Sequence, residues 1–292
     1  MIRFFPKSPF CLVIFCFLTS CSVTSYQKAG SVSPGTFHYK TTFTEFKSCI
    51  VIPLIIGNDT SNFLFDTGCQ ITLLQNDTVT GGKLKITGAS DNTAKLSHAR
   101  IDTLIIGDIL INNTHAASGN FEGIKEQIPT FGGLIGQPII NKANWLIDYP
   151  NKTIEISSQD LSDETFKTIR ISEKGGSPFT FITIDGKKYK ALIDLGSSKG
   201  MSIPQNQEPA NAIIQKYDLH ENEREVFRIG GLEKVKEHIG IIPVIEIGDI
   251  VFNDVETAVF NTNKIRIGNL FFKDCQLYID NTNKCYKVKR AR

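Results

Sequence analysis

Short apolar runs alternate with turn-forming residues along most of the chain. The run Leu104–Ile106, for example, is followed directly by Gly and Asp. Short runs between Gly, Asn and Asp favour strands, whereas a helix needs apolar residues every three or four positions over a longer stretch. The clearest helix-like pattern is at Ala210–Leu219. The pattern therefore predicts an all-β fold with few short helices.

One arrangement of strands and turns occurs twice in the chain. An apolar strand ends in Asp-x-Gly at Phe63–Gly68, and a second one does so at Ala191–Gly196, roughly 130 residues later. Matching landmarks in a fixed order indicate a duplicated unit, so we expect two homologous lobes. The other matched landmarks are Leu104–Ile109 with Ile245–Ile250, Leu134–Gly136 with Arg266–Gly268, and Leu146–Asp148 with Tyr278–Asp280.

The duplicated unit sets the expected domain boundaries. Residues 38–157 should form the N-terminal lobe and residues 177–292 the C-terminal lobe, joined by a linker at 158–176. Each lobe is long enough to bury a core of its own. The pairs Asn151-Lys152 and Asn283-Lys284 predict the turn of a closing hairpin in each lobe.

The first 20 residues are typical of a signal peptide. Arg3 and Lys7 precede an apolar stretch that is too short to cross a bilayer as a stable helix. The stretch ends in Leu18–Cys21, which resembles the lipobox of bacterial lipoproteins. That resemblance implies cleavage before Cys21, acylation of the Cys21 thiol and a lipid-anchored protein of the cell envelope. A plain secretory signal that happens to end near a Cys is the alternative.

The segment that follows the lipobox is expected to be a lipidated tether. Residues 21–37 are rich in Ser, Thr and Gly, which favours a flexible chain. Ser22 is not the Asp that favours retention at the inner membrane in the lipoprotein family. The resemblance therefore favours the outer membrane, with the body facing the periplasm or the cell exterior and the lipid bilayer as a partner through Cys21.

Composition argues against several other classes of protein. The net charge is +2 and basic residues gather only at the last few positions, whereas phosphate binding needs a concentrated basic face, so no nucleic-acid partner is expected. The His and Cys residues lack metal-ligand spacing, so we expect no metal and no other cofactor. A disulfide is permitted outside the cytoplasm, but its pairing stays open. The Cys residues of the body are Cys49, Cys69, Cys275 and Cys285.

The two Asp-x-Gly turns carry the candidate chemistry. The strand before Asp66 or Asp194 holds the carboxylate rigidly at a turn, and the Gly that follows lets the chain bend and lets substrate approach. If the turns face each other, two such close charges cannot both form, and the carboxyl groups share one proton. One group can then activate water while the other polarises a carbonyl. A plainer interpretation, an Asp that caps a strand end, fits a duplicated motif less well.

At these positions the chain resembles the retropepsin and pepsin clan of aspartic peptidases. Asp66–Cys69 and Asp194–Ser197 are similar to the two active-site loops of that clan, and the resemblance covers most of residues 45–290. It implies two retropepsin-like lobes in a pepsin-like monomer, and an endopeptidase that hydrolyses extended polypeptides. The implied site residues are Asp66 and Asp194 as the catalytic pair; Thr67, Gly68, Cys69, Leu195, Gly196 and Ser197 as loop support; and Gly88, Gly230 and Gly231 in the substrate-covering hairpins, or flaps.

The second loop departs from the clan at one position. In the clan, a Thr hydroxyl after each Asp reaches the backbone of the opposite loop; Thr67 has this hydroxyl and Leu195 does not. This loss keeps two alternatives open, a catalytically degenerate peptide-binding lipoprotein and a structural envelope protein whose lobes only form an interface. Cys69 stands where the clan usually has Ser or Ala. As a peptidase nucleophile it would need a His partner, which no motif provides.

Overall fold

The computed structural model describes residues 25–78, 82–228 and 231–290. Within these ranges the chain is mostly β and its sheets form two lobes, so the predicted all-β, two-lobed fold is confirmed. The expected signal peptide (1–20), the lipid-attachment residue Cys21 and the flap residue Gly230 lie outside the described residues.

The N-terminal lobe is built on one sheet, with strand order β1-β9-β6-β10-β5-β4-β8-β7 and β3 paired to β4. Near the end of β8, Leu104 and Ile106 face the core while Ile105 between them is partly exposed, as the two-residue repeat of a strand requires. The strands are β1 (Ser31–Ser33), β3 (Thr44–Phe46), β4 (Cys49–Ile56), β5 (Asp59–Phe65), β6 (Thr72–Gln75), β7 (Leu84–Thr87), β8 (Thr93–Ile106), β9 (Ile109–Gly119) and β10 (Phe131–Ile135).

The C-terminal lobe repeats this plan, with strand order β14-β15-β16-β21-β17-β20-β19-β18. In both lobes the strand that ends at the candidate Asp pairs in parallel with a later strand, β5 with β10 and β16 with β21. The strands are β14 (Ser172–Lys174), β15 (Ser177–Ile184), β16 (Lys187–Ile193), β17 (Met201–Pro204), β18 (His220–Arg228), β19 (Gly231–Ile247), β20 (Ile250–Phe260) and β21 (Arg266–Ile267).

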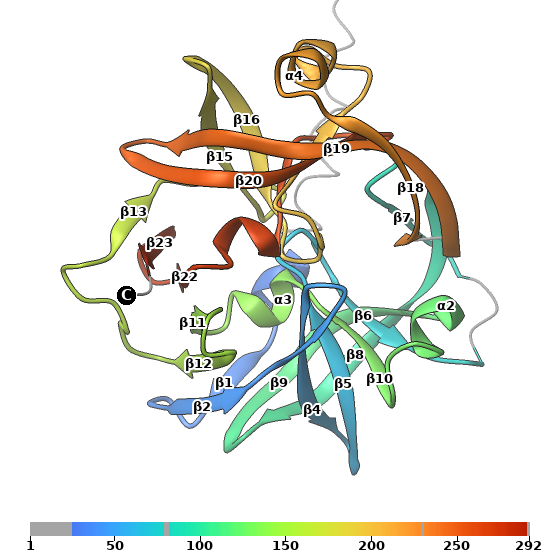
Figure 1. Cartoon of the computed structure of the whole chain (residues 1–292). Coiled ribbons are helices and arrows are strands. Elements are labelled where there is room, and N and C mark those ends of the chain that lie inside the picture. Colours follow the sequence, from blue (N-terminus) through green and yellow to red (C-terminus); the bar gives the residue numbers. More distant parts are fainter. Residues whose placement is uncertain (1–24, 79–81, 229–230, 291–292) are drawn as a thin grey trace, which may run out of the picture.

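The helical segments of the described residues are short. α4 (Ala210–Lys216) confirms the helix predicted at Ala210–Leu219, and α2 is Glu122–Lys125. α3 (Gln137–Ile140) and the 3-10 turn η1 (Asn269–Phe272) follow the two Ile-Gly pairs of the repeat. Figure 1 shows the two lobes one above the other, with the β4, β5, β8 and β9 strands below and β15, β16, β19 and β20 above.

A third sheet joins the lobes, which the sequence pattern did not predict. Its strand order is β13-β23-β22-β11-β12-β2, and the pairing of β11 with β22 links the two halves of the repeat. The closing hairpins have their turns at Asn151-Lys152 and Asn283-Lys284, as predicted. The strands are β2 (His38–Thr42), β11 (Asn144–Asp148), β12 (Thr153–Ser157), β13 (Lys167–Ile169), β22 (Cys275–Asp280) and β23 (Cys285–Arg290).

Two segments expected to be loose are partly built into the body. In the 21–37 segment, β1 pairs with β9, and the buried Gln27 side chain donates hydrogen bonds to the carbonyls of Gln70 and Gly175. In the 158–176 segment, β13 pairs with β23 and β14 pairs with β15. Backbone pairing with distant strands fixes both segments, and local composition carries no sign of such partners.

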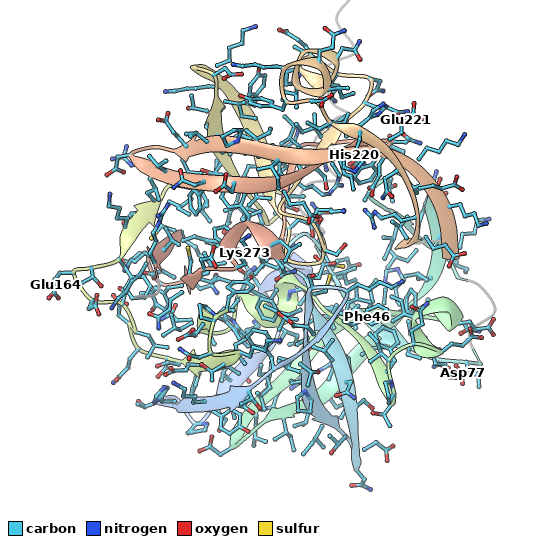
Figure 2. The ribbon with its side chains drawn as sticks, in the orientation of Figure 1. Phe46, Asp77, Glu164, His220, Glu221 and Lys273 are labelled. Atoms are coloured by element: carbon cyan, nitrogen blue, oxygen red, sulfur yellow. The ribbon has the colours of Figure 1, made fainter. Side chains whose placement is uncertain are left out.

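A shared apolar core holds the two lobes together. Trp145 is fully buried; its indole N–H donates to the Ile140 carbonyl and its ring packs edge-on against Phe65. Charged side chains such as Asp77 and Glu164 project outward at opposite edges of the molecule (Figure 2).

Across the described ranges, no helix is both long enough and apolar enough to span a membrane.

Candidate active site

Asp66 and Asp194 occupy matching places, one residue beyond the ends of β5 and β16. The Asp66 N–H donates to the Ile135 carbonyl at 3.0 Å, and the Asp194 N–H donates to the Ile267 carbonyl at 2.8 Å. These bonds continue the parallel pairing of each strand with its neighbour, so the backbone of each Asp is held by the sheet.

The two carboxyl groups face each other across the lobe interface. A Cβ atom added at Gly68 would lie 2.6 Å from the carboxyl carbon of Asp194, and one added at Gly196 would lie 2.4 Å from the carboxyl carbon of Asp66. Each loop glycine therefore packs directly against the acid of the opposite loop. Any side chain at either glycine would displace that acid, which explains the Asp-x-Gly pattern in both halves.

The surroundings of Asp66 favour its protonated form. Burial and the nearby charge of Asp194 raise the pKa of Asp66 well above its ordinary value, and a hydrogen bond with the Asp194 carboxyl acts in the same direction. The N–H groups of Gly68 and Cys69 oppose this shift by donating to Asp66 Oδ1 at 2.8 and 3.0 Å. Asp194 Oδ1 accepts one such bond, from Gly196 N–H at 3.1 Å.

Arg266 also contacts the pair, and the sequence pattern did not single it out as a site residue. Its Nε donates to Asp194 Oδ2 at 2.9 Å, and the two side chains are only 7% and 14% exposed. The rest of the guanidinium donates to the Thr262 hydroxyl, the Lys264 carbonyl and Asn263 Oδ1. The signal that could have found it is the repeat, because Arg266 in the second half corresponds to Leu134 in the first half, just before the Ile-Gly pair.

Thr67 links the two loops in one direction. Its buried hydroxyl donates to the Ile193 carbonyl at 2.8 Å and accepts from the Leu195 N–H at 3.0 Å, so it clamps the backbone on both sides of Asp194. Leu195 returns no such bond, and its fully buried side chain packs in the shared core instead.

Two amides hold the loops from behind in matching ways. Gln137, the first residue of α3, donates to the Thr67 carbonyl at 2.6 Å, and Asn269, the first residue of η1, donates to the Leu195 carbonyl at 2.5 Å. Asn269 also donates to the Ser197 carbonyl at 3.2 Å. The Ile-Gly landmark is thus explained, because it starts the turn that delivers an amide to each loop.

The cysteines near the site are neutral thiols with local partners. Cys69 donates from Sγ to the Ile71 carbonyl at 2.9 Å rather than to a histidine, and burial with the charge of Asp66 raises the pKa of its thiol. Cys49, absent from the predicted site, donates to the Gly196 carbonyl at 3.4 Å. Both thiols, with Cys275 and Cys285, are unpaired, so the disulfide that the sequence left open is absent among the described residues.

Two hairpins from opposite lobes meet near the loop that carries Asn263. Gly88 lies at the tip of the β7–β8 hairpin, where its carbonyl accepts from the Asn263 side chain at 3.2 Å and the Ala89 carbonyl accepts from the Asn263 N–H at 2.9 Å. Gly231 begins β19 in the β18–β19 hairpin. The Asn92 side chain donates to Glu233, which joins the two hairpins, and Figure 1 shows β7 and β18 on the same side of the molecule.

The described residues give no sign of a metal site, since they contain no group of three or more His, Cys, Asp or Glu arranged to hold an ion. The chemistry available at the lobe interface is that of two acids and one buried guanidinium.

No protein-family model matches the chain, and a search of curated proteins finds no match.

Proposed function

We propose that this chain is an aspartic endopeptidase in which Asp66 and Asp194 activate one water molecule between them. The observation that carries the proposal is the reciprocal packing of each loop glycine against the opposite carboxyl group. The resemblance of Asp66–Cys69 and Asp194–Ser197 to the active-site loops of the retropepsin and pepsin clan supports it. So does the raised pKa of Asp66, because perturbed acids gather at catalytic sites.

The proposed reaction needs only the two acids, water and a peptide bond. The ionised carboxylate accepts a proton from water as the water oxygen bonds to the scissile carbonyl carbon, and the protonated carboxyl donates to the carbonyl oxygen. The tetrahedral intermediate then collapses: the C–N bond breaks, and the leaving nitrogen takes the proton that the first carboxylate accepted from water. A hydroxyl of the intermediate returns its proton to the second carboxylate as the carbonyl re-forms, so both acids regain their starting states. An extended polypeptide is the expected substrate, because hairpin strands offer backbone groups for strand addition.

Access to the pair is compatible with this chemistry. Asp66 and Asp194 are partly exposed rather than sealed, and Gly196, which packs against the Asp66 carboxyl, is exposed. Partial enclosure weakens competition from bulk water and strengthens the electrostatic interactions at the pair. Peptide substrate would enter beneath the β7–β8 and β18–β19 hairpins.

The proposal is tested by cleavage of a denatured protein mixture across acidic to neutral pH. The mature chain with Cys21→Ser, which removes the lipid, should cleave, and Asp66→Asn and Asp194→Asn should each lower the rate by at least about 100-fold. Undiminished cleavage in either variant would refute the two-acid mechanism. Near-ultraviolet circular dichroism should be the same for all three proteins, which excludes unfolding as the cause.

A second candidate function is favoured by specific departures from symmetry. Leu195 gives no hydroxyl to the first loop, and Arg266 occupies one oxygen of Asp194. These features would suit a peptide-binding lipoprotein that uses the same site without turnover. Binding of denatured polypeptide without cleavage would favour this candidate, and neither binding nor cleavage would favour a structural envelope protein.

We also propose that the chain is anchored through Cys21 in the cell envelope, at the outer membrane. The support is the lipobox-like sequence Leu18–Cys21 and the absence of Asp at position 22. The body is proposed to be a monomer, because its two homologous lobes supply both acids within one chain.

A further inference from the structure

We propose that Arg266 is a positioning residue that holds Asp194 as the ionised carboxylate, so that Asp66 carries the proton the two acids share. The inference rests on the proposed function and refines it, because it assigns different roles to two groups that the duplicated sequence makes look equivalent. Asp194 becomes the base that accepts the proton of water, and Asp66 becomes the acid that polarises the substrate carbonyl.

The contact is built rather than adventitious. Arg266 is 6% exposed, and its donors reach Asp194 Oδ2, the Thr262 hydroxyl, the Lys264 carbonyl and Asn263 Oδ1. A buried guanidinium with four acceptors cannot swing away without leaving donors unpaired. The other three contacts therefore hold the guanidinium in place for its 2.9 Å bond to Asp194.

The repeat supplies an internal comparison. Leu134 stands in the first half where Arg266 stands in the second, and its uncharged side chain packs against an apolar cluster. Within the described part of the chain, the backbone N–H groups that donate to the Asp66 carboxyl are those of Gly68 and Cys69. A permanent positive charge thus touches one acid and not the other, and it favours the charged form of the acid it touches.

The other charged and titratable groups around the pair do not offset this asymmetry. Lys264, on the loop just before Arg266, also acts on Asp194 through its charge, and Asp91 on the β7–β8 hairpin acts on Lys264. The thiols of Cys49 and Cys69 stay protonated, because burial raises the pKa of both. Arg224 acts on Cys49 from the other hairpin. Among the cations of the described ranges, Arg266 is the one in direct contact with an acid of the pair.

The two oxygens of Asp194 are used differently as a result. Oδ2 accepts from Arg266 Nε and Oδ1 accepts from the Gly196 N–H, so the second lone pair of Oδ1 is the one we assign to a water molecule. As pH falls, the ionised carboxyl group of a pair without Arg266 would take up a proton at a higher pH than it does in this pair. Cleavage should therefore extend further into the acidic range than it would without Arg266.

Replacement of Arg266 in the whole mature chain tests the inference. Arg266→Leu gives the second half the residue that the first half has at Leu134, and Arg266→Lys keeps the positive charge. If the Leu variant does not fold, Arg266→Gln keeps polar contacts to the loop without the charge. Lys264→Gln is the matched control, because it removes a nearby cation that lies over an aromatic ring and not against either acid. The Lys264 Nζ lies 5.9 Å from the centre of the Phe179 ring.

The first measurement needs no turnover. Carbon-13 NMR of the aspartate carboxyl groups, assigned with Asp66→Asn and Asp194→Asn, should show the Asp194 signal at its ionised position at pH values where Asp66 is still protonated. In Arg266→Leu, Asp194 should no longer ionise before Asp66 as pH rises, whereas in Lys264→Gln it should still do so. The inference is overturned if the native order is the reverse, or if Arg266→Leu leaves both titrations unchanged.

The second measurement is the pH dependence of cleavage. In Arg266→Leu the acidic midpoint should move up by about one pH unit or more, because an opposite charge at this distance is worth at least that. In Arg266→Lys and Lys264→Gln it should move by much less. An unmoved midpoint in Arg266→Leu contradicts the inference while the endopeptidase proposal stands. A wild type without cleavage defeats the endopeptidase proposal, and the NMR titration still decides the role of Arg266.

Discussion

Thr67 clamps the second loop through the Leu195 N–H, whereas Leu195 gives the first loop no hydroxyl in return. The Thr67 hydroxyl accepts from that N–H at 3.0 Å and donates to the Ile193 carbonyl at 2.8 Å. Since Leu195 is fully buried in the shared core, apolar packing occupies the place of the missing hydrogen bond. Between the two Asp-x-Gly loops, the Thr67 hydroxyl therefore provides a polar lock in one direction and Leu195 an apolar contact in the other.

Thr67→Val should weaken this interface. The Leu195 N–H and the Ile193 carbonyl would lose a buried partner, so the free energy of unfolding should fall by about 1–3 kcal/mol. The loop that carries Asp194 should also loosen, which should lower kcat more than it raises KM. Urea denaturation and steady-state kinetics check both expectations. The matched control is Thr60→Val at an exposed position of β5, and equal stability of the two variants would contradict the expectation.

The stability of the chain should depend on pH in two opposite ways. The pKa of Asp66 is raised in the folded chain, so between its ordinary value of 3.8 and that raised value the folded state binds a proton that the unfolded state has released. The free energy of unfolding should therefore decrease as pH rises through this window. Asp66→Asn should remove the decrease, which denaturation at a series of pH values would detect.

Asp160 should behave in the opposite sense. Burial acts to raise its pKa, but hydrogen bonds from Ser162 and the charge of Lys287 outweigh burial and lower the pKa to about 2. The stability that these bonds provide is present above 3.8, and it should be lost as pH falls from 3.8 toward about 2. Asp160→Asn should flatten the acidic end of the same curve. A steeper acidic loss in that variant would contradict the assignment.

The β7–β8 hairpin should open more readily when its contact with Asn263 is broken. The Asn263 amide donates to the Gly88 carbonyl at 3.2 Å and to Asp91 Oδ1 at 2.7 Å. Asn263→Asp removes these donors but keeps an oxygen for Arg266. Hydrogen exchange in the hairpin should accelerate about fivefold for each net bond of about 1 kcal/mol.

Asn253→Ala, at an exposed position of β20, is the control for this experiment. It should leave exchange in the β7–β8 hairpin unchanged. Identical exchange in Asn263→Asp and the native chain would mean that the hairpin is held by other contacts, such as the one between Asn92 and Glu233.

The thiols should react slowly in the folded chain. Burial raises the pKa of Cys49 and Cys69, and it raises the pKa of Cys275 to about 11. The thiolate is the reactive form, so iodoacetamide should label these residues much faster after denaturation than before. Rapid labelling of Cys69 in the native chain, with loss of activity, would instead favour a cysteine nucleophile.

Lipid attachment should depend on one thiol outside the described residues. The chain with its native sequence, expressed in a bacterium, should partition with the membrane fraction. The Cys21→Ser variant should instead be found in the soluble fraction. Cys69→Ser is the control and should leave partitioning unchanged. Membrane association that survives Cys21→Ser would refute the lipoprotein proposal.

The sequence by itself determined the features that depend on neighbouring residues. Alternating apolar positions and turn residues specified the strands, and the duplicated Asp-x-Gly turns marked Asp66 and Asp194 as a candidate pair. The Ile-Gly landmarks of the repeat stand directly before α3 and η1. Each of these signals lies within a few residues of the feature it predicts.

Only the tertiary structure decided which distant groups meet. Arg266 lies 72 residues from Asp194, and an Arg at the start of a strand gives no local sign of its partner. The same holds for the pairing of β11 with β22, the docking of Gln27 on the body and the contact between Asn263 and the β7–β8 hairpin. These contacts depend on how whole sheets pack, and the residues on either side of each partner carry no record of them.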